Sequence, residues 1–456
     1  MLDNLKGRLI RGVSANGLGQ IVTVLIQIVS VPIFLKSWGN ELYGEWLILS
    51  AIPTYLSLSD MGFTTAAANE MNMKVAENNR SAASEIFQSM RLLITIISLT
   101  LSSIVILVTS FLPVNTFLNV THLNRFEVLC VISALTLYVL TGMQKSLVMA
   151  AFRCDGNFAF GVTYGSLLRL LEYVGVTTVV LLGASPVIAA LVFWLICTFS
   201  LFLMVFSLSK KSPWLFASHN NAVNWKTITG LVKPAMASMC FPLSTAINNQ
   251  GITIAIGSIL GPKDVVVFST LRTLSRLALQ VMVMIKDATS PEISSAYARN
   301  DMMIARKLHR YSCQFSLWLG LIFIALIAFS GKWIIQTWTH GIVKFDFVLL
   351  CIMLSSVLIS SFWYISIAVL TSTNNHQKAA IWYLIGTLLS LGLAITTLPK
   401  FGLNGAAISL AFADIWMLTF VVKNSLILLQ DDLSSYLQVI LIPPFLKEFN
   451  KFFNRI

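Results

Sequence analysis

Residues 92–114 read LLITIISLTLSSIVILVTSFLPV and contain no charged side chain. A helix rises about 1.5 Å per residue, so a segment of this length can cross the roughly 30 Å hydrocarbon core of a bilayer. A transmembrane β-strand would instead alternate apolar and polar residues over about ten positions. The stretch therefore predicts a membrane-spanning helix.

The rest of the chain has a similar composition. Of its 456 residues, 31 are Lys or Arg and 19 are Asp or Glu, so only 11% are charged, against about 25% in soluble domains. The hydrophobic fraction is 56%, and the mean hydropathy is +0.80. So few charges cannot cover a soluble surface of this size. A cytosolic enzyme, a secreted disulfide protein and a disordered chain are therefore excluded.

Twelve segments have the length and apolar character of a span, which predicts an all-α polytopic membrane protein. We place them at about 14–35, 44–68, 92–114, 128–151, 160–184, 187–209, 236–260, 265–290, 311–331, 347–370, 380–399 and 406–429.

Lysine and arginine are unevenly distributed between the loops that join these spans. Of the 31, 21 belong to one alternating set of segments that includes both termini, counting Lys286 and Lys423 near the cytoplasmic ends of their spans with the adjoining segments. Another 6 fall in the other set, and the remaining four lie deeper inside spans. Cytoplasmic loops retain the cations, so both termini are expected in the cytoplasm. The net charge of +12 is then a topology signal, and no nucleic-acid partner is expected. The basic start leads into a full-length span without a cleavage site, so we expect no cleaved signal peptide.

The chain repeats itself at an offset of 222 residues. Gly39 matches Gly261, and Glu70 matches Glu292. Six spans per repeat is an even number, so the halves enter the membrane in the same orientation, as parallel six-helix bundles around a central cavity. We expect an N-terminal lobe at 1–209, a cytoplasmic linker at 210–235, a C-terminal lobe at 236–430 and a cytoplasmic amphipathic tail at 431–456.

Polar residues recur at helical spacing in the first two spans of each half. Candidate cavity residues are Asn16, Gln20 and Gln27 in the first span, Asn248 and Asn249 in the seventh, and Gln280 in the eighth. Such residues often serve only to hydrogen-bond helices to one another. Because matched positions of both halves carry these stripes, we favour a shared water-filled cavity.

Arg272 and Arg276 are four residues apart in the eighth span, so both leave the same helix face. Arg276 lies roughly 16 Å from the outer end of that span. An arginine at such depth requires a partner or water. The guanidinium fork suits phosphate, which predicts a substrate-binding role. Pairing with a carboxylate, or snorkelling to the interface, is the alternative.

Acidic residues inside spans are candidates for ion coupling. Asp60 could carry a proton or sodium ion, or could cap a helical turn, and Asp414 has no obvious partner in the sequence. Arg169 and Glu172 are three apart and are expected to pair, whereas Lys145 is expected to snorkel to the cytoplasmic face.

The last residues, Phe445–Ile456, place phenylalanines on one helical face and cations on the other, which predicts an amphipathic helix on the inner leaflet. The sequence contains no Walker loop, zinc-ligand cluster or nucleophile elbow, and its five histidines are scattered. We therefore expect no enzyme activity, no catalytic residue, no metal and no cofactor.

Three short motifs resemble those of one transporter family. They are Ala15-Asn16-Gly17, the run Gly39-Asn40-Glu41-Leu42-Tyr43-Gly44-Glu45-Trp46, and Asp60-Met61-Gly62-Phe63. These resemble the polysaccharide-repeat-unit flippases, the Wzx-type O-antigen transporters of the multidrug/oligosaccharidyl-lipid/polysaccharide (MOP) exporter superfamily. The resemblance covers the whole chain.

This resemblance implies a lipopolysaccharide or capsule transporter of the bacterial cytoplasmic (inner) membrane, without an ATPase of its own. Such proteins move oligosaccharide units linked to undecaprenyl diphosphate from the cytoplasmic to the periplasmic leaflet, by alternating access, and polysaccharide polymerase machinery is a further implied partner. A sugar-diphosphate head group is too polar to cross lipid unaided and needs a hydrated, cationic path.

Three alternatives remain at this stage. A cation-coupled multidrug antiporter of the same superfamily would need an acidic, aromatic cavity. A lipid II flippase usually has additional helices. A membrane glycosyltransferase or repeat-unit polymerase generally needs a large external loop, and the longest one here covers only about residues 332–346.

Overall fold

The computed structural model describes residues 2–56, 62–216, 225–372 and 376–444. The structure is 89% helical, and no strand occurs in those ranges. The prediction of an all-α polytopic membrane protein is confirmed. Asp60 and the tail Phe445–Ile456 lie outside the described residues.

The contacts between Cα atoms divide the chain into two compact units, Met1–Val266 and Val267–Ile456. The helices up to the first boundary are α1 (Leu2–Leu56), α2 (Phe63–Ala76), α3 (Arg80–Phe111), α4 (Val114–Phe117), α5 (Arg125–Cys154), α6 (Phe158–Leu181), α7 (Pro186–Lys211), the 3₁₀ turn η2 (Pro213–Leu215), α8 (Trp225–Ala246), the π-helical turn η3 (Ile247–Gly251) and α9 (Ile252–Ile259). The remaining helices are α10 (Pro262–Ala298), which crosses the boundary, α11 (Met302–Trp338), α12 (Phe347–Tyr364), α13 (Ser366–Ser372), α14 (His376–Phe401), α15 (Leu403–Leu428) and α16 (Leu433–Leu441).

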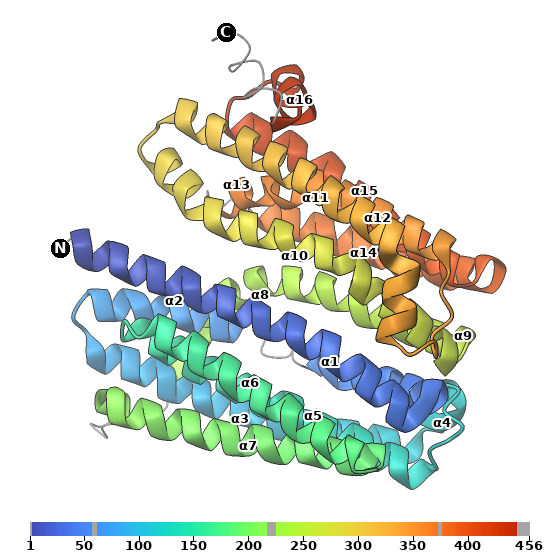
Figure 1. Cartoon of the computed structure of the whole chain (residues 1–456). Coiled ribbons are helices and arrows are strands. Elements are labelled where there is room, and N and C mark those ends of the chain that lie inside the picture. The colour runs from blue at the N-terminus through green and yellow to red at the C-terminus, as the bar shows by residue number, and fades with distance from the viewer. Residues whose placement is uncertain (1, 57–61, 217–224, 373–375, 445–456) are drawn as a thin grey trace. The chain divides into compact units, whose positions relative to one another are not determined.

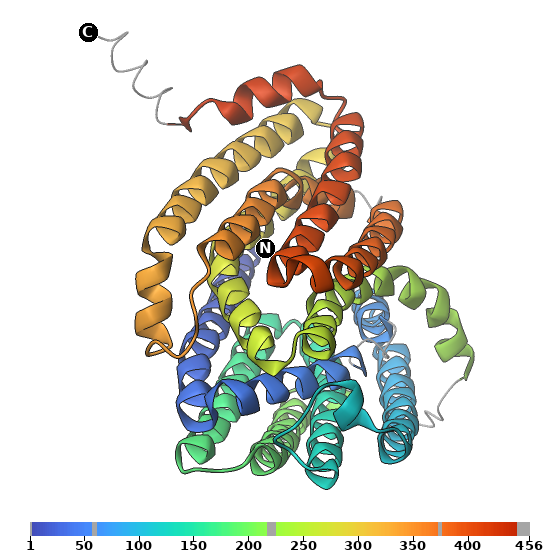
Figure 2. The same cartoon turned by 90° about the vertical axis from the view of Figure 1, so that its right-hand side faces the viewer.

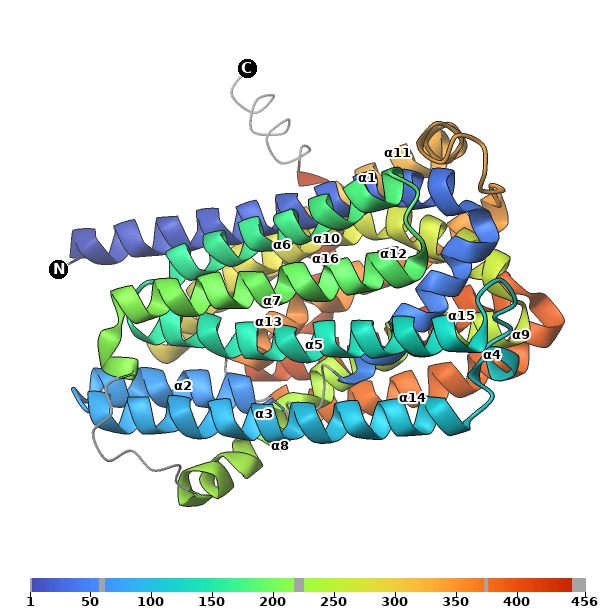
Figure 3. The ribbon, with the colours of Figure 1, turned by 90° about the horizontal axis from the view of Figure 1, so that it is seen from below.

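Ten helices of the described residues are long and apolar enough to span a membrane. Helix α1 contains the first predicted span and about half of the second, and it counts as one of the ten. The two spans are separated by Gly39, whose φ of 71° and ψ of −176° favour glycine over residues with a side chain. Figure 3 shows α1 running from the N-terminus along the bundle and then bending sharply. The seventh predicted span is broken into α8, η3 and α9. A twelve-span layout is therefore consistent with the structure.

In the first unit, α3, α5, α6 and α7 run side by side (Figures 1 and 3). Helix α5 packs against both α3 and α7, and α2 packs against α3 and α5. The core between them is built from large apolar side chains, among them Phe87, Met90, Leu147 and Phe152. Apolar residues also cover the outside, where Phe202 of α7 is 64% exposed. Lipid, rather than water, suits such a surface.

In the second unit, α12 and α14 pack against α15. Trp382 of α14 and Trp416 of α15 stack with ring centroids 4.6 Å apart, and each indole Nε1 donates to the other residue's carbonyl at 3.0 Å. Gly386 leaves room for this pair, because a Cβ there would collide with the Trp416 ring. The two indole N–H groups are thus satisfied inside the bundle.

The helix α16 lies within the predicted tail at 431–456, but the sequence analysis placed an amphipathic helix only over Phe445–Ile456. Helix α16 lies along α11, as Figure 2 shows. Its Tyr436 is buried and stacks on His309, while Trp318 Nε1 donates to the Ile440 carbonyl at 3.1 Å. The first part of the predicted tail is therefore anchored to α11 of the second unit.

Candidate functional site

Two arginines lie on one face of α10, as their spacing predicts. Arg276 is exposed, whereas Arg272 is partly buried with its guanidinium carbon 5.3 Å from the centroid of the Phe268 ring. The two cations are close enough to repel each other. Gln280 is partly buried one turn further along α10. All three polar side chains take part in further contacts within the protein.

Asp414 of α15 lies among groups from two other helices. Its Oδ2 accepts a hydrogen bond from Ser356 Oγ, and its Oδ1 accepts one from Trp363 Nε1 at 3.3 Å. Ser360 also hydrogen-bonds to this carboxylate, and Arg276 interacts with it electrostatically. These partners on α12 were not evident from the sequence, because they lie more than 50 residues before Asp414 in the chain.

The second unit therefore combines two guanidinium groups with one carboxylate that already accepts hydrogen bonds from α12. The local balance is cationic. Arginine presents its donors as a planar fork that matches carboxylate and phosphate oxygens. This arrangement, the α10 arginine site, can bind an anion. A carboxylate beside the arginines is also a group through which a cation or proton could be coupled.

The polar residues of the seventh predicted span fall in the π-helical turn η3. Asn248 and Asn249 belong to this turn, and Thr253 Oγ1 donates to the Asn249 carbonyl at 2.8 Å. Asn248 Oδ1 is buried and has no hydrogen-bond partner among the described residues. Such π turns often occur at functional sites because they turn side chains away from the regular helical face. Both asparagines thus sit where the helix geometry is irregular.

The turn η3 and helix α9 pack against α1. A Cβ at Gly257 would meet the Ile48 side chain, and one at Gly44 would collide with the Pro262 backbone. The second half of α1 and the seventh span are therefore in close contact. Gln20 and Gln27, from the first half of α1, are partly buried, and the side chain of Asn16 lies outside the described residues.

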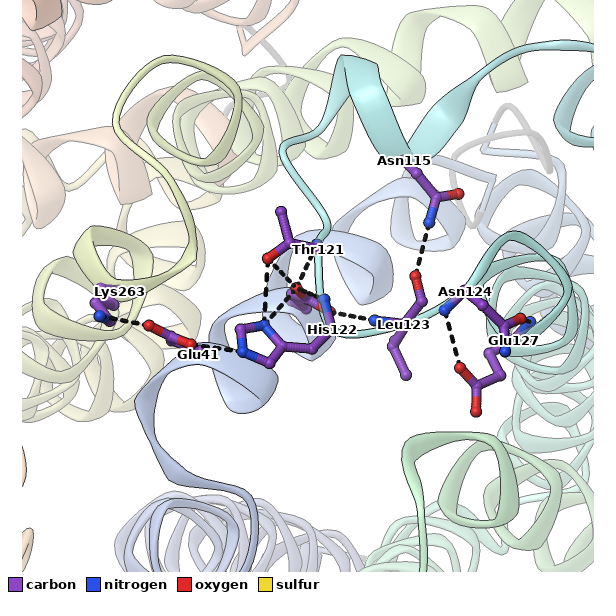
Figure 4. A network of polar contacts seen from close by, with 9 residues as sticks. Glu41, Asn115, Thr121, His122, Leu123, Asn124, Glu127 and Lys263 are labelled. Carbon is purple, nitrogen blue, oxygen red and sulfur yellow. Dashed lines mark hydrogen bonds and ion pairs between the residues drawn. The ribbon is translucent and has the colours of Figure 1, made fainter.

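A polar network that the sequence analysis missed surrounds His122 (Figure 4). Glu45 is fully buried and accepts hydrogen bonds from the backbone N–H groups of Thr121 and His122, both at 2.7 Å, and of Leu123 at 3.2 Å. The ring of His122 bridges two carboxylates, with Nδ1 3.1 Å from Glu45 and Nε2 2.6 Å from Glu41. We call this network the His122 hub.

Lys263, at the start of α10, pairs with Glu41 and extends the hub. The hub thus joins the segment after the Gly39 bend, the turn before α5 and the start of α10. This explains why the run from Gly39 to Trp46 carries two glutamates four residues apart. No group of three His, Cys, Asp or Glu in the described part of the chain is arranged to hold a metal ion.

The expected pair of Arg169 and Glu172 is wrong. Glu172 of α6 pairs with Lys145 of α5, and their side chains are 2% and 14% exposed. Tyr138 lies next to this pair, with its hydroxyl 3.5 Å from Glu172. Lys145 therefore points to a buried partner rather than snorkelling to the interface. Arg169 is exposed and makes no ion pair with any described residue.

No protein-family model matches the chain, and no curated protein sequence matches it. Solved structures match nearly its whole length. An inward-facing multidrug resistance MATE family transporter of the MOP superfamily has a TM-score of 0.76 at 13% identity, and the match covers 90% of this chain and 94% of that one. The chain has the MATE transporter fold.

An outward-facing MATE family transporter matches with a TM-score of 0.66 at 14% identity, covering 93% of this chain and 95% of that chain. A MOP superfamily transporter from Pyrococcus furiosus, described as having a binding pocket of reverse polarity, matches with a TM-score of 0.63 at 13% identity and the same coverage. The resemblance seen in the sequence motifs thus agrees with the fold of this superfamily.

Proposed function

We propose that the chain is a flippase for lipid-linked oligosaccharides, and that it moves repeat units attached to undecaprenyl diphosphate from the cytoplasmic to the periplasmic leaflet. The transport would supply O-antigen or capsule synthesis and deliver its product to polysaccharide polymerase machinery. The chain would act by alternating access and not as an enzyme.

The observation that carries this proposal is the α10 arginine site. Arg276 is an exposed arginine within a helix that is long and apolar enough to span the membrane. The neighbouring Asp414 already accepts hydrogen bonds from Ser356 and Trp363, so its charge is partly satisfied elsewhere. A diphosphate offers several oxygens to two guanidinium forks, and such contacts are charge-assisted.

The π turn with Asn248 and Asn249, and the glutamines of α1, supply uncharged donors and acceptors. Sugar hydroxyls are recognised by groups of this kind, because hydroxyls both donate and accept hydrogen bonds. The arginines of the second unit are chemically suited to a diphosphate, and the amides of the first unit are chemically suited to sugar hydroxyls.

The direct test is a flipping assay in proteoliposomes. Purified protein is reconstituted with a fluorescent undecaprenyl-diphosphate oligosaccharide, and its transfer to the outer leaflet is measured with a membrane-impermeant quencher. We expect transfer above the rate of protein-free vesicles and inhibition by unlabelled lipid-linked oligosaccharide. No transfer under a proton gradient, a sodium gradient or no gradient would refute the proposal.

A second candidate is a cation-coupled multidrug antiporter. Asp414 favours it, because a carboxylate near the arginines could exchange a proton or sodium ion for a cationic drug. Two of the matched structures are multidrug resistance transporters. The Pyrococcus furiosus protein, however, is described by a pocket of reverse polarity and a suggested different function. Ethidium efflux from the same proteoliposomes separates the two candidates.

We further propose that the protein lies in the bacterial cytoplasmic membrane with both termini in the cytoplasm. Asn119, His340 and Asn300 are exposed residues of three turns and serve as reporters. Single cysteines at Asn119 and His340 should react with an impermeant thiol reagent on spheroplasts, and one at Asn300 should not. Labelling of Asn300 from outside would reverse the proposed orientation.

A further inference from the structure

A cavity of about 330 Å³ lies in the first unit, among α3, α5, α7 and the segment that follows α7. Figure 3 shows these three helices side by side. One wall is polar: Arg91, Thr95, Ser98 and Ser102 follow one another along α3 at steps of four, three and four. The residues that line the cavity from α5 and α7 are mostly apolar and include Leu140 and Leu201, and Gln144 of α5 adds a polar group. The cavity is separate from the α10 arginine site, which belongs to the second unit.

Arg91 is the last residue before the uncharged run 92–114, so it lies where the hydrocarbon core is expected to begin. It is exposed and lines the cavity. The distribution of charges places this end of α3 on the cytoplasmic side. An arginine at this depth faces the phosphates of the inner leaflet, to which basic side chains near a membrane surface are attracted.

Hydrogen-bonding groups continue deeper along the same wall. Thr95 lies about 6 Å below Arg91 along the helix axis. Gln144 of α5 reaches it, with Nε2 3.1 Å from Thr95 Oγ1. One turn further, Ser98 Oγ is buried without a hydrogen-bond partner among the described residues. A buried hydroxyl of this kind is costly unless a ligand satisfies it.

The segment that follows α7 lines the cavity and is held against α3 by several contacts. Phe216 lines the cavity and packs edge-on against Phe87, with ring centroids 5.7 Å apart. The preceding carbonyl, of Leu215, accepts hydrogen bonds from Gln88 Nε2 at 2.8 Å and Ser84 Oγ at 3.1 Å. These contacts distinguish the cavity from an ordinary crevice between two helices.

We propose that this cavity binds one anionic glycerophospholipid. Its phosphate contacts Arg91, its ester carbonyls lie at the level of Thr95, Gln144 and Ser98, and an acyl chain follows the apolar side chains of α5 and α7. A polyprenyl diphosphate fits less well, because its chain carries no hydrogen-bond acceptor below the phosphates. A zwitterionic lipid would bring its own cation toward Arg91. This inference does not depend on the proposed transport function.

The test measures lipid retention by native mass spectrometry. Full-length protein is equilibrated with equal amounts of phosphatidylglycerol and phosphatidylcholine in mixed micelles. The wild type should retain one phosphatidylglycerol in preference to phosphatidylcholine. Arg91→Gln should weaken that binding about tenfold, the order expected for one charge-assisted contact. Arg299→Gln is the matched control, since Arg299 is also an exposed arginine in a predicted cytoplasmic segment. It should bind as the wild type does.

Ser98→Val removes the buried hydroxyl and should reduce the retention of phosphatidylglycerol by a smaller factor. This second variant keeps the test decisive if Arg91→Gln folds poorly. Equal retention of both lipids by the wild type, or unchanged binding in both variants, would overturn the proposal. Undecaprenyl diphosphate is then added in competition. If undecaprenyl diphosphate displaces the bound phosphatidylglycerol, and does so at a lower concentration than phosphatidylglycerol needs in order to bind, the assignment to a phospholipid is wrong.

Discussion

Each unit of the protein has a carboxylate near a basic side chain inside its helical bundle, and the two arrangements differ. In the first unit, Glu172 is 2% exposed and contacts Lys145 directly. In the second, Asp414 accepts hydrogen bonds from neutral groups of α12, and Arg276 beside it is exposed. A closed, buried ion pair holds helices together, whereas an exposed cation whose carboxylate neighbour is bonded elsewhere can also serve a ligand.

The largest effect is expected from removing the cation of the buried Lys145–Glu172 ion pair. Lys145→Met leaves the buried Glu172 carboxylate without its cation, which typically costs about 3–5 kcal/mol. We expect a sharp loss of folded protein, measured by immunoblotting of membranes and by thermal unfolding in detergent. The double variant Lys145→Met, Glu172→Gln removes both charges and should recover most of the loss. If the single variant is as abundant as the wild type, the pair does not hold α5 to α6.

The second prediction concerns the second unit and tests whether its exposed Arg276 serves a ligand. Arg276→Ala should lower transport at least about tenfold, since a bidentate charge-assisted contact is worth more than about 1.4 kcal/mol. Arg276→Lys should keep part of the activity, and Arg276→Glu none. All three should reach normal levels in the membrane. Arg299→Ala, an exposed arginine just after α10, is the control and should transport normally. Depletion of Arg276→Ala would instead place Arg276 in a structural pair like Lys145.

The third prediction concerns the His122 hub. It compares how much the buried carboxylate of Glu45 and the more exposed carboxylate of Glu41 contribute to stability. Glu45→Ala removes the acceptor of three backbone N–H groups, and losing hydrogen bonds to a charged group costs about 1.5–3 kcal/mol. We expect a lower unfolding temperature. Glu41→Ala removes a carboxylate that is 40% exposed and should change that temperature little. Equal effects of the two substitutions would mean that Glu45 has no special role.

The smallest effect is expected at Asp432, which caps the N-terminus of α16 by accepting from the Ser435 N–H at 3.1 Å. The Ser434 hydroxyl and this N–H lower the pKa of Asp432. A lowered pKa means that the cap stabilises α16 fully above the unfolded value of about 3.9, and that this contribution is lost as the pH falls through the folded value. Asp432→Ala should therefore speed hydrogen exchange in Leu433–Leu441 at pH 7. At a pH below the folded pKa of Asp432, the variant and the wild type should exchange alike.

The charged residues of the two units show what the sequence could reveal about the site. The spacing of Arg272 and Arg276 is enough to place both on one face of α10, because a helix returns to the same face every three to four residues. The same reasoning chose Arg169 as the partner of Glu172 and was wrong. A contact 27 residues away, across two helices, replaced the local one.

The spans and the break between the first two of them follow from the sequence, because hydrophobic length is a local property. The tertiary structure alone decided four other features. These are the partners of Asp414, the π turn at Asn248, the docking of α16, and the hub that joins Glu41, Glu45, His122 and Lys263. Each of these depends on which helices pack together. The spans of this chain are almost uniformly apolar, so the sequence gives little indication of which helices will be neighbours. The partner of each polar group therefore depends on which helices come into contact in the folded protein.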